Sequence, residues 1–260
     1  MKYLFTLLFV VLLTTIQLNA QDSLGIRQVG SMFNYWDEAY AVAISGDIVY
    51  VATDHTGLNV MTISEENHLS QAGHLRGISP HSIIFENDQA YLLAQQNLTI
   101  TNLDENPVII GSIDLDYGMY FDVEDDLAVI SCLRVGLIIV DVSEPEQPEI
   151  ISATDMPEDP LGVAVCGSTI FASYDDEGVY IINIENLNEP EIILQIEEYG
   201  DVNHIVIKEN LAVFSTEESG VIFLDVSNIQ EPDEISSFQR GRSYKKTQIR
   251  DNLAYSQYDW

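Results

Sequence analysis

The chain has 260 residues, and its 42 acidic and 10 basic residues give a formal net charge of −32 at pH 7. A field of this sign repels nucleic acids and anionic membrane surfaces, so we expect no nucleic-acid partner. Length alone allows one large domain or two small ones.

The first twenty residues have the pattern of a secretory signal peptide. Lys2 precedes an apolar run over residues 3–13, and a small residue, Ala20, stands at a plausible cleavage point. The run is too short to span a bilayer. We therefore expect residues 1–20 to be removed, residues 21–260 to form a single domain without membrane insertion, and the mature protein to be secreted or held at the cell surface.

One phrase recurs along the rest of the chain. Residues 136–152 read GLIIVDVSEPEQPEIIS, and related phrases begin at Gly57, Asn97, Gly178 and Gly220. The spacing of about forty residues, in a sequence rich in Val, Ile and Tyr, predicts repeated small β-sheets.

Each repeat divides into four short strands, which in the third repeat are expected over residues 120–124, 127–132, 137–142 and 149–154. Turns such as END, EDD and KEN join the first two strands, because Gly, Asn and Asp tolerate the positive φ of tight hairpins. The strands are apolar on both faces, so the sheets must stack on one another. Radial stacking of four-stranded antiparallel sheets is a β-propeller.

The count of strands predicts six blades. First strands are expected to begin near residues 41, 82, 120, 162, 204 and 246, but the last repeat stops at Trp260, before its third strand. Residues 26–33 (IRQVGSMF) match the fourth-strand pattern, so we expect this N-terminal strand to complete the last blade and close the ring. We also expect the sequence to be a fragment; the alternative is a last blade that is incomplete by nature.

The motif LIIVDVS at residues 137–143 resembles the LVIVD repeat of bacterial and archaeal surface proteins. GVIFLDVS at residues 220–227 and GLNVMTIS at residues 57–64 are looser copies, and the resemblance extends over nearly all of residues 21–260. It implies a β-propeller with a role at the cell surface, and it does not specify a ligand.

No catalytic motif stands out. The five histidines form no HExxH pair, and GxSxG, GxxxxGK and GxGxxG motifs are missing from the sequence. Residues 114–126 begin like a calcium-binding loop, but Gly118 occupies a ligand position and no Glu closes the loop. We therefore predict no cofactor, with Ca²⁺ as the one ion that acidic loops could hold.

Binding sites of propellers lie where loops gather at one mouth of the channel. Our candidate ligand-binding residues are the aromatic, acidic, basic and imidazole groups of those loops: Trp36, His81, Tyr117, Asp201, His204, Tyr244 and Lys245. Exposed aromatic side chains in loops are costly unless they pack or bind. Five of the ten basic residues fall between Arg240 and Arg250, which predicts a local basic patch that is either a partner site or a neutralised seam between blades.

Cys132 and Cys166 lie in different repeats. In an oxidising exterior they could form a disulfide, and two free thiols fit the sequence equally well. For function we expect a non-catalytic module that binds a protein or carbohydrate partner. The alternatives are an extracellular polysaccharide lyase or hydrolase with its site at the channel mouth, and a calcium-stabilised structural module of a larger surface protein.

Overall fold

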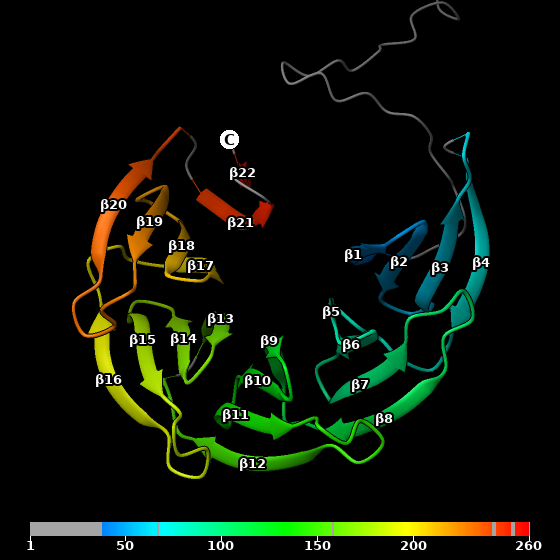
Figure 1. Ribbon diagram of the computed structural model, residues 1–260, viewed down its shortest axis with the longest axis horizontal. Helices are drawn as coiled ribbons and strands as arrows, with labels where there is room; N and C mark the ends of the chain where they lie inside the picture. The colour runs from blue at the N-terminus through cyan, green and yellow to red at the C-terminus, as the bar shows by residue number, and fades with distance from the viewer. Residues whose placement is uncertain (1–37, 67, 158, 241–242, 251–252, 260) are drawn as a thin grey trace, which may run out of the picture.

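The computed structural model describes residues 38–259 apart from residues 67, 158, 241–242 and 251–252. All the regular secondary structure in these residues is β, and it forms five four-stranded antiparallel sheets and one two-stranded sheet. The sheets, here called blades I to VI, stand around a common axis like the blades of a propeller (Figure 1). In the described part of the chain, no helix is long and apolar enough to cross a membrane.

The strands follow one another from the axis outward in every blade. Blade I contains β1 (Ala39–Ser45), β2 (Ile48–Thr53), β3 (Gly57–Ile63) and β4 (Leu69–Leu75), and blade II contains β5 (Ser82–Glu86), β6 (Gln89–Leu93), β7 (Asn97–Asn102) and β8 (Ile109–Asp114). Blade III contains β9 (Gly118–Glu124), β10 (Leu127–Cys132), β11 (Gly136–Asp141) and β12 (Glu149–Thr154), and blade IV contains β13 (Pro160–Cys166), β14 (Thr169–Tyr174), β15 (Gly178–Asn183) and β16 (Glu191–Ile196). Blade V contains β17 (Val202–Lys208), β18 (Leu211–Thr216), β19 (Val221–Asp225) and β20 (Asp233–Phe238), and blade VI contains β21 (Ser243–Arg250) and β22 (Leu253–Asp259).

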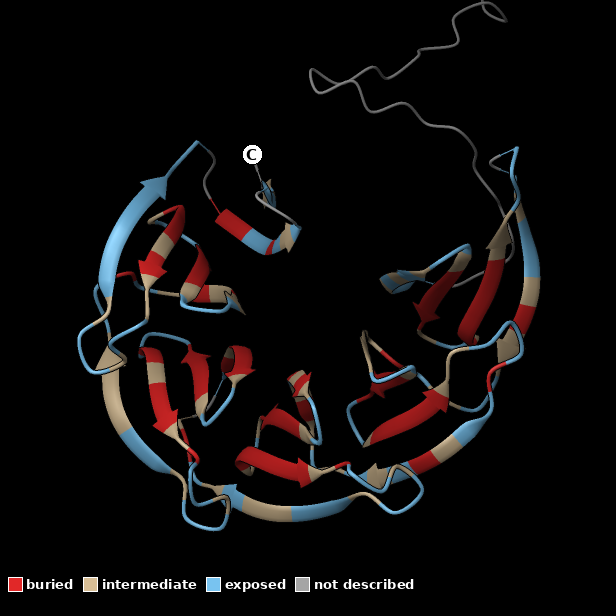
Figure 2. Cartoon of the chain, in the orientation of Figure 1, coloured by how far each residue is buried: buried red, intermediate tan, exposed pale blue. Residues whose placement is uncertain are grey.

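The core lies between the blades. Val129 and Ile139 of blade III, for example, pack against Val163 and Val165 of blade IV. The second and third strands of blades I to V are therefore largely buried, whereas most innermost strands are only partly buried. The outermost strands are the most exposed, and β20 is exposed along its whole length (Figure 2). Burial on both faces of a sheet explains why its strands read as continuous apolar runs rather than alternating ones.

The glycine that opens the repeated phrase has a defined steric role. Gly136 has a φ of 83°, and a Cβ atom there would clash with the backbone carbonyl oxygen of Thr154 in the neighbouring strand β12. Gly57, Gly178 and Gly220 also have a positive φ, between 75° and 93°, and a similar close approach to an outermost strand. The repeat conserves this glycine within the chain because any side chain would displace the outermost strand.

The predicted strands agree closely with the structure, with one systematic difference. Five innermost strands begin two or three residues earlier than predicted, because a β-bulge near the start of each one lets pairing continue. In β9, for example, pairing shifts register and resumes between Gly118 and Cys132. The exception, β5, has no register shift and begins at Ser82, as predicted.

Blade VI contains two strands in the described residues, and the blades leave an opening between β21–β22 and blade I (Figure 1). On the other side of this opening, Val42 and Ile44 of β1 are 65% and 60% exposed. The N-terminal strand predicted at residues 26–33 lies outside the described residues.

Candidate binding site in the central channel

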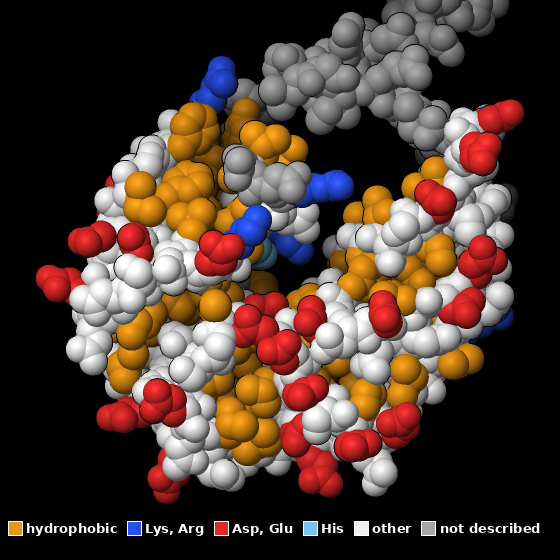
Figure 3. Space-filling view, viewed as in Figure 1, with side chains coloured by type: hydrophobic (Ala, Val, Ile, Leu, Met, Phe, Trp, Pro, Cys, Tyr) orange, Lys and Arg blue, Asp and Glu red, His pale blue; other side chains and the backbone are white. Residues whose placement is uncertain are grey.

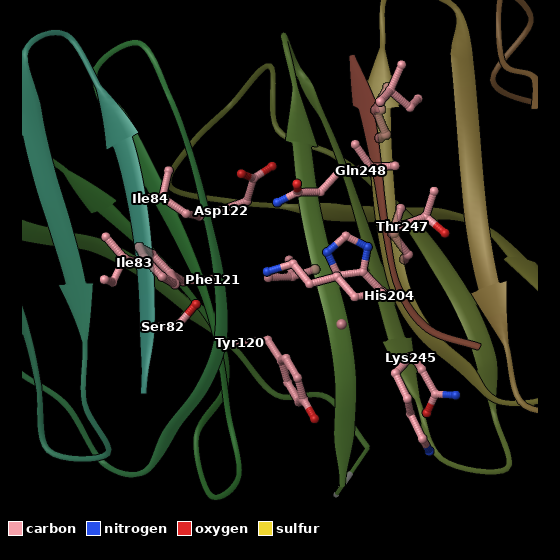
Figure 4. A pocket seen from close by; sticks show the side chains of 18 of the residues that line it. Ser82, Ile83, Ile84, Tyr120, Phe121, Asp122, His204, Lys245, Thr247 and Gln248 are labelled. Carbon is pink, nitrogen blue, oxygen red and sulfur yellow. The ribbon is translucent and has the colours of Figure 1, made fainter. Parts of the chain in front are cut away.

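A cavity of about 980 Å³ lies where the innermost strands converge. It is lined by residues of β5, β9, β13, β17 and β21, together with His81 before β5 and Tyr255 of β22. Figure 4 shows Tyr120 and Asp122 on one wall, with His204 and Lys245 on the opposite side. The cavity is therefore lined mainly by the innermost strands of the blades. Their hydrogen-bonded backbones hold the lining side chains in defined positions.

Polar side chains on these strands bond the backbone of the next blade. The Nε2 of His81 lies 3.2 Å from the carbonyl oxygen of Gly118 and can donate a hydrogen bond to it. The Asp122 carboxylate accepts hydrogen bonds from the amides of Val123, at 3.0 Å, and Val165, at 2.9 Å. These bonds join blade II to blade III and blade III to blade IV at the wall of the cavity.

The titratable groups of the wall are perturbed by burial. Burial raises the pKa of Asp122 to about 6, opposed by the two backbone hydrogen bonds. Burial also lowers the pKa of His204 to about 4, and the positive charge of Lys246 acts in the same direction. Partial desolvation lowers the pKa of Lys246 as well. At neutral pH the wall therefore combines a neutral imidazole, a cationic ammonium group and a buried carboxylate.

Three of the predicted site residues line the cavity. They are His81, His204 and Lys245. His204 lies on β17 and Lys245 on β21, so both project from strands rather than from the loops in which the sequence placed them.

Three other predicted residues lie elsewhere. Tyr117 sits at the corner between β8 and β9 with a φ of 60°, and the Arg134 guanidinium stacks over its ring at 4.5 Å. Asp201 accepts a hydrogen bond from the amide of Asp176 at 2.9 Å in the preceding blade. Tyr244 was expected to be exposed but is 1% exposed.

Tyr244 is buried because its ring packs against Tyr258, with centroids 5.6 Å apart, in the core between blades V and VI. The aromatic residue that the sequence offered as a ligand contact is thus part of the core. The remaining candidate, Trp36, lies outside the described residues.

The sequence reasoning missed several wall residues because it considered loops alone. Tyr120, Asp122, Lys246, Gln248 and Arg250 line the cavity from the innermost strands β9 and β21. Polar and charged residues alternating with apolar ones inside a first strand were the available signal. The sequence predicts a basic patch between Arg240 and Arg250, but not that Lys245, Lys246 and Arg250 line the cavity.

The two cysteines are free thiols. Burial raises the pKa of both, that of Cys132 to about 12. Of the two alternatives that the sequence left open, the structure therefore has the unpaired thiols and no disulfide between Cys132 and Cys166.

Within the described ranges, no group of three or more His, Cys, Asp or Glu side chains is arranged to hold a metal ion. Asp and Glu side chains are spread over the visible face, including the edge of the central opening, and several Lys and Arg side chains of the described chain lie at this opening beside blade VI (Figure 3).

Comparison with solved structures gives the fold. A computationally designed protein, Ika8, superposes with a TM-score of 0.68 at 12% identity, covering 89% of this chain and 71% of Ika8. Sqt1 from Chaetomium thermophilum has a TM-score of 0.66 at 10% identity, with 82% of this chain and 62% of Sqt1 covered. A functionally unknown protein from Desulfotomaculum acetoxidans DSM 771 has a TM-score of 0.65 at 12% identity, with 82% and 70% covered. At these identities the likeness concerns the fold alone.

The family comparison concerns the repeats. No curated protein matches the chain. The profile of the LVIVD repeat matches residues 38–75, which are blade I, and residues 123–155, which are most of blade III. With the repeated sheets around one axis, these matches identify the chain as an LVIVD-repeat protein with a β-propeller fold.

Proposed function

We propose that this protein is an exported, non-catalytic binding module that acts at or outside the cell surface, with its ligand site in the central cavity. The leader-like residues 1–20 and the net charge of −32 support export to the exterior. The LVIVD repeats support a propeller scaffold. A scaffold does not define a ligand, so the site itself must carry the functional argument.

The observation that carries the proposal is the cavity. Its volume of about 980 Å³ is at the upper end of what small-molecule sites occupy, roughly 300–1,000 Å³. Apolar residues such as Phe121 and Ile84 line it together with polar groups of Asn203 and Gln248. A few polar groups placed among apolar walls are what orient a bound molecule.

The hydrogen bonds of the wall favour binding over proton transfer. Asp122 is held by two backbone amides, and His81 is engaged with the backbone of β9. Both side chains therefore form hydrogen bonds that connect neighbouring blades. A lyase or hydrolase would need two titratable groups that converge on a reacting bond.

Obstruction of the cavity tests the proposal. Gln248 is an exposed residue of β21 that lines the cavity, so Gln248→Trp should fill space without disturbing the core. Gln147→Trp is the matched control, because Gln147 is exposed on the loop between β11 and β12, outside the cavity. Binding of the protein and of both variants is measured on arrays of neutral oligosaccharides, acidic oligosaccharides and peptides.

We expect at least one class of array ligand to bind the protein and Gln147→Trp, and to be lost in Gln248→Trp. Binding that survives in Gln248→Trp would place the site elsewhere. Failure of every ligand class to bind would remove the binding proposal.

Chromatography of the same oligosaccharides after incubation separates binding from catalysis. We expect the chains to stay intact. Cleavage that is lost in His81→Asn or His204→Asn, with melting temperature retained, would establish the enzyme instead.

Two further measurements test export and calcium. Expression of the full chain in a bacterial host should yield an extracytoplasmic protein whose mass lacks residues 1–20; an uncleaved cytoplasmic product would contradict export. A chelator should leave the melting temperature unchanged, whereas a fall that added Ca²⁺ reverses would support the calcium-stabilised module.

A further inference from the structure

The charge of the cavity wall is opposite to that of the molecule. The chain carries a formal charge of −32, yet the described residues that line the cavity include Lys245, Lys246 and Arg250 and a single acidic residue, Asp122. The whole chain has only 10 basic residues, and three of them line this one cavity. Their charges concentrate a positive electrostatic potential there. A cavity that focuses positive charge attracts anions.

The alternation of side chains along β21 places its basic residues on the face that points away from the core of blade V. In β21, Thr247 and Ile249 turn toward blade V, where Thr247 bonds Ser215 at 2.7 Å and Ile249 joins the core cluster. Because successive side chains of a strand point to opposite faces, Lys246 and Arg250 point away from blade V. Both line the cavity, and both are exposed.

These cations have no carboxylate partner in the described part of the chain. The ion pairs there join His55 to Asp54, His68 to Glu66 and Arg134 to Asp116, all outside the cavity. Asp122, the acid of the wall, is occupied by the amides of Val123 and Val165. The positive charge of β21 is therefore available to a ligand.

A second polar group of the wall is also unsatisfied. The Nδ1 atom of His204 is buried and has no hydrogen-bond partner. His204 lines the cavity on β17, and its ring points into it (Figure 4). Buried polar atoms in native proteins are almost always paired, so this atom at a cavity calls for a water molecule or a ligand group as its partner.

Aromatic rings provide the remaining contact surface. Tyr120 and Tyr255 line the cavity and are 37% and 56% exposed. Exposed tyrosine faces suit the apolar face of a ring and keep a hydroxyl for hydrogen bonding. The cavity has far more room than a bare inorganic ion needs.

We propose that the central cavity binds an organic anion, with its acidic group between Lys246 and Arg250 and its body against Tyr120 and Tyr255. This inference rests on the proposed binding function and adds the chemical class of the ligand. His204 and Gln248 complete the polar contacts of the site.

Calorimetric titration of the purified protein tests the inference with three probes: trigalacturonate as the organic anion, neutral galactotriose as its uncharged counterpart, and inorganic phosphate. We expect trigalacturonate to bind, galactotriose to bind at least tenfold more weakly, and phosphate to bind weakly because it makes no aromatic contact. Salt should weaken the binding of trigalacturonate, since its contacts are ionic and partly exposed.

Lys246→Gln and Arg250→Gln should each reduce the affinity for trigalacturonate at least tenfold. Lys208→Gln is the matched control, because it removes the same charge from an exposed position of the neighbouring strand β17 that does not line the cavity. Lys208→Gln should change affinity less than twofold. Melting temperatures of all three variants verify that the fold is retained.

The outcomes separate the two proposals. Equal binding of galactotriose and trigalacturonate, or unchanged affinity in Lys246→Gln and Arg250→Gln, would overturn the anion site. If a neutral ligand binds and Gln248→Trp blocks it, the binding function stands without the anionic class. Binding of phosphate as tight as that of trigalacturonate would show a site for inorganic anions and also overturn the inference.

Discussion

Asp122 and His204 face the same cavity, and burial shifts their pKa values in opposite directions. Asp122 has its pKa raised to about 6, so the folded state binds a proton more readily than the unfolded state. Its contribution to stability therefore falls as pH rises from about 4 to 6. His204 has its pKa lowered to about 4, so its contribution is lost as pH falls from about 6.5 to 4. In the wild-type protein these two effects oppose each other.

Replacing either residue alone should reveal how the other contribution to stability depends on pH. We expect the stability of Asp122→Asn relative to wild type to increase by about 1–2 kcal/mol as pH rises from about 4 to 6. The relative stability of His204→Gln should decrease over the same interval. Urea unfolding at several pH values measures both, and parallel pH profiles for the two variants would contradict the assignment of opposite shifts.

Gly136 allows steric clash to be separated from backbone strain. Gly136 and Gly77 both have a φ of 83°, but a Cβ atom at Gly77 would meet no atom within 4 Å. Gly77→Ala should therefore cost about 1 kcal/mol from the positive φ alone. Gly136→Ala adds the clash with Thr154 and should cost about 2–4 kcal/mol. Equal losses of unfolding free energy would show that β12 shifts without cost.

At the scale of elements, a buried hydroxyl of blade VI adds a polar contact to the apolar core that it shares with blade V. Thr247 of β21 is fully buried, and its hydroxyl lies 2.7 Å from both Ser215 of β18 and Ser256 of β22. Thr247→Val keeps the shape and removes the hydroxyl, and we expect a loss of about 1–2 kcal/mol. The control is Thr62→Val, which removes an exposed hydroxyl that bonds Ser70 at 2.9 Å.

Thr62→Val should change the free energy of unfolding by less than about 0.5 kcal/mol. Guanidinium unfolding curves provide the comparison. An equally small loss in Thr247→Val would mean that the Thr247 hydroxyl does not stabilise the contact between blades V and VI.

The elements were largely predictable because each repeat contains its own local signals. Hairpin turns such as Asn87–Asp88 have the positive φ that their residue types favour. The bulges were not predictable, since a register shift depends on how two strands pair and leaves no fixed residue type at Gly118 or Val202. The burial of Tyr244 was missed for a related reason: contact with Tyr258 forms between strands, and the sequence shows only the strand.

The site was less predictable than the fold. His81, His204 and Lys245 were found through their residue types, but the cavity depends on which strands approach the axis and which faces they turn to it. A count of charges located the basic residues in the chain. It could not show that they face away from the core of blade V.

At the scale of the whole molecule, the opening between blades VI and I raises the question of how the ring behaves in solution. Val163 of β13 and Val42 of β1 have equivalent places on their innermost strands, three residues before the last residue of the strand. Val163 packs against blade III and is 7% exposed, whereas Val42 faces the opening and is 65% exposed. At the equivalent places of the other described blades Phe121, Ile205 and Thr247 are buried and Ile83 is half-buried, so this position is most exposed where the described ring is open.

Matching substitutions at Val163 and Val42 test whether the opening exists in solution. Val163→Thr places a hydroxyl between two blades and should cost about 1–3 kcal/mol, because a buried hydroxyl without a partner loses its hydration. Val42→Thr should change the free energy of unfolding by less than about 0.5 kcal/mol, because its side chain already meets solvent. Urea unfolding of both variants and of the unchanged protein measures these differences in the free energy of unfolding. Equal costs would mean that Val42 is covered in solution, so that the ring is closed by chain outside the described residues or by a second copy, and sedimentation equilibrium would distinguish these two.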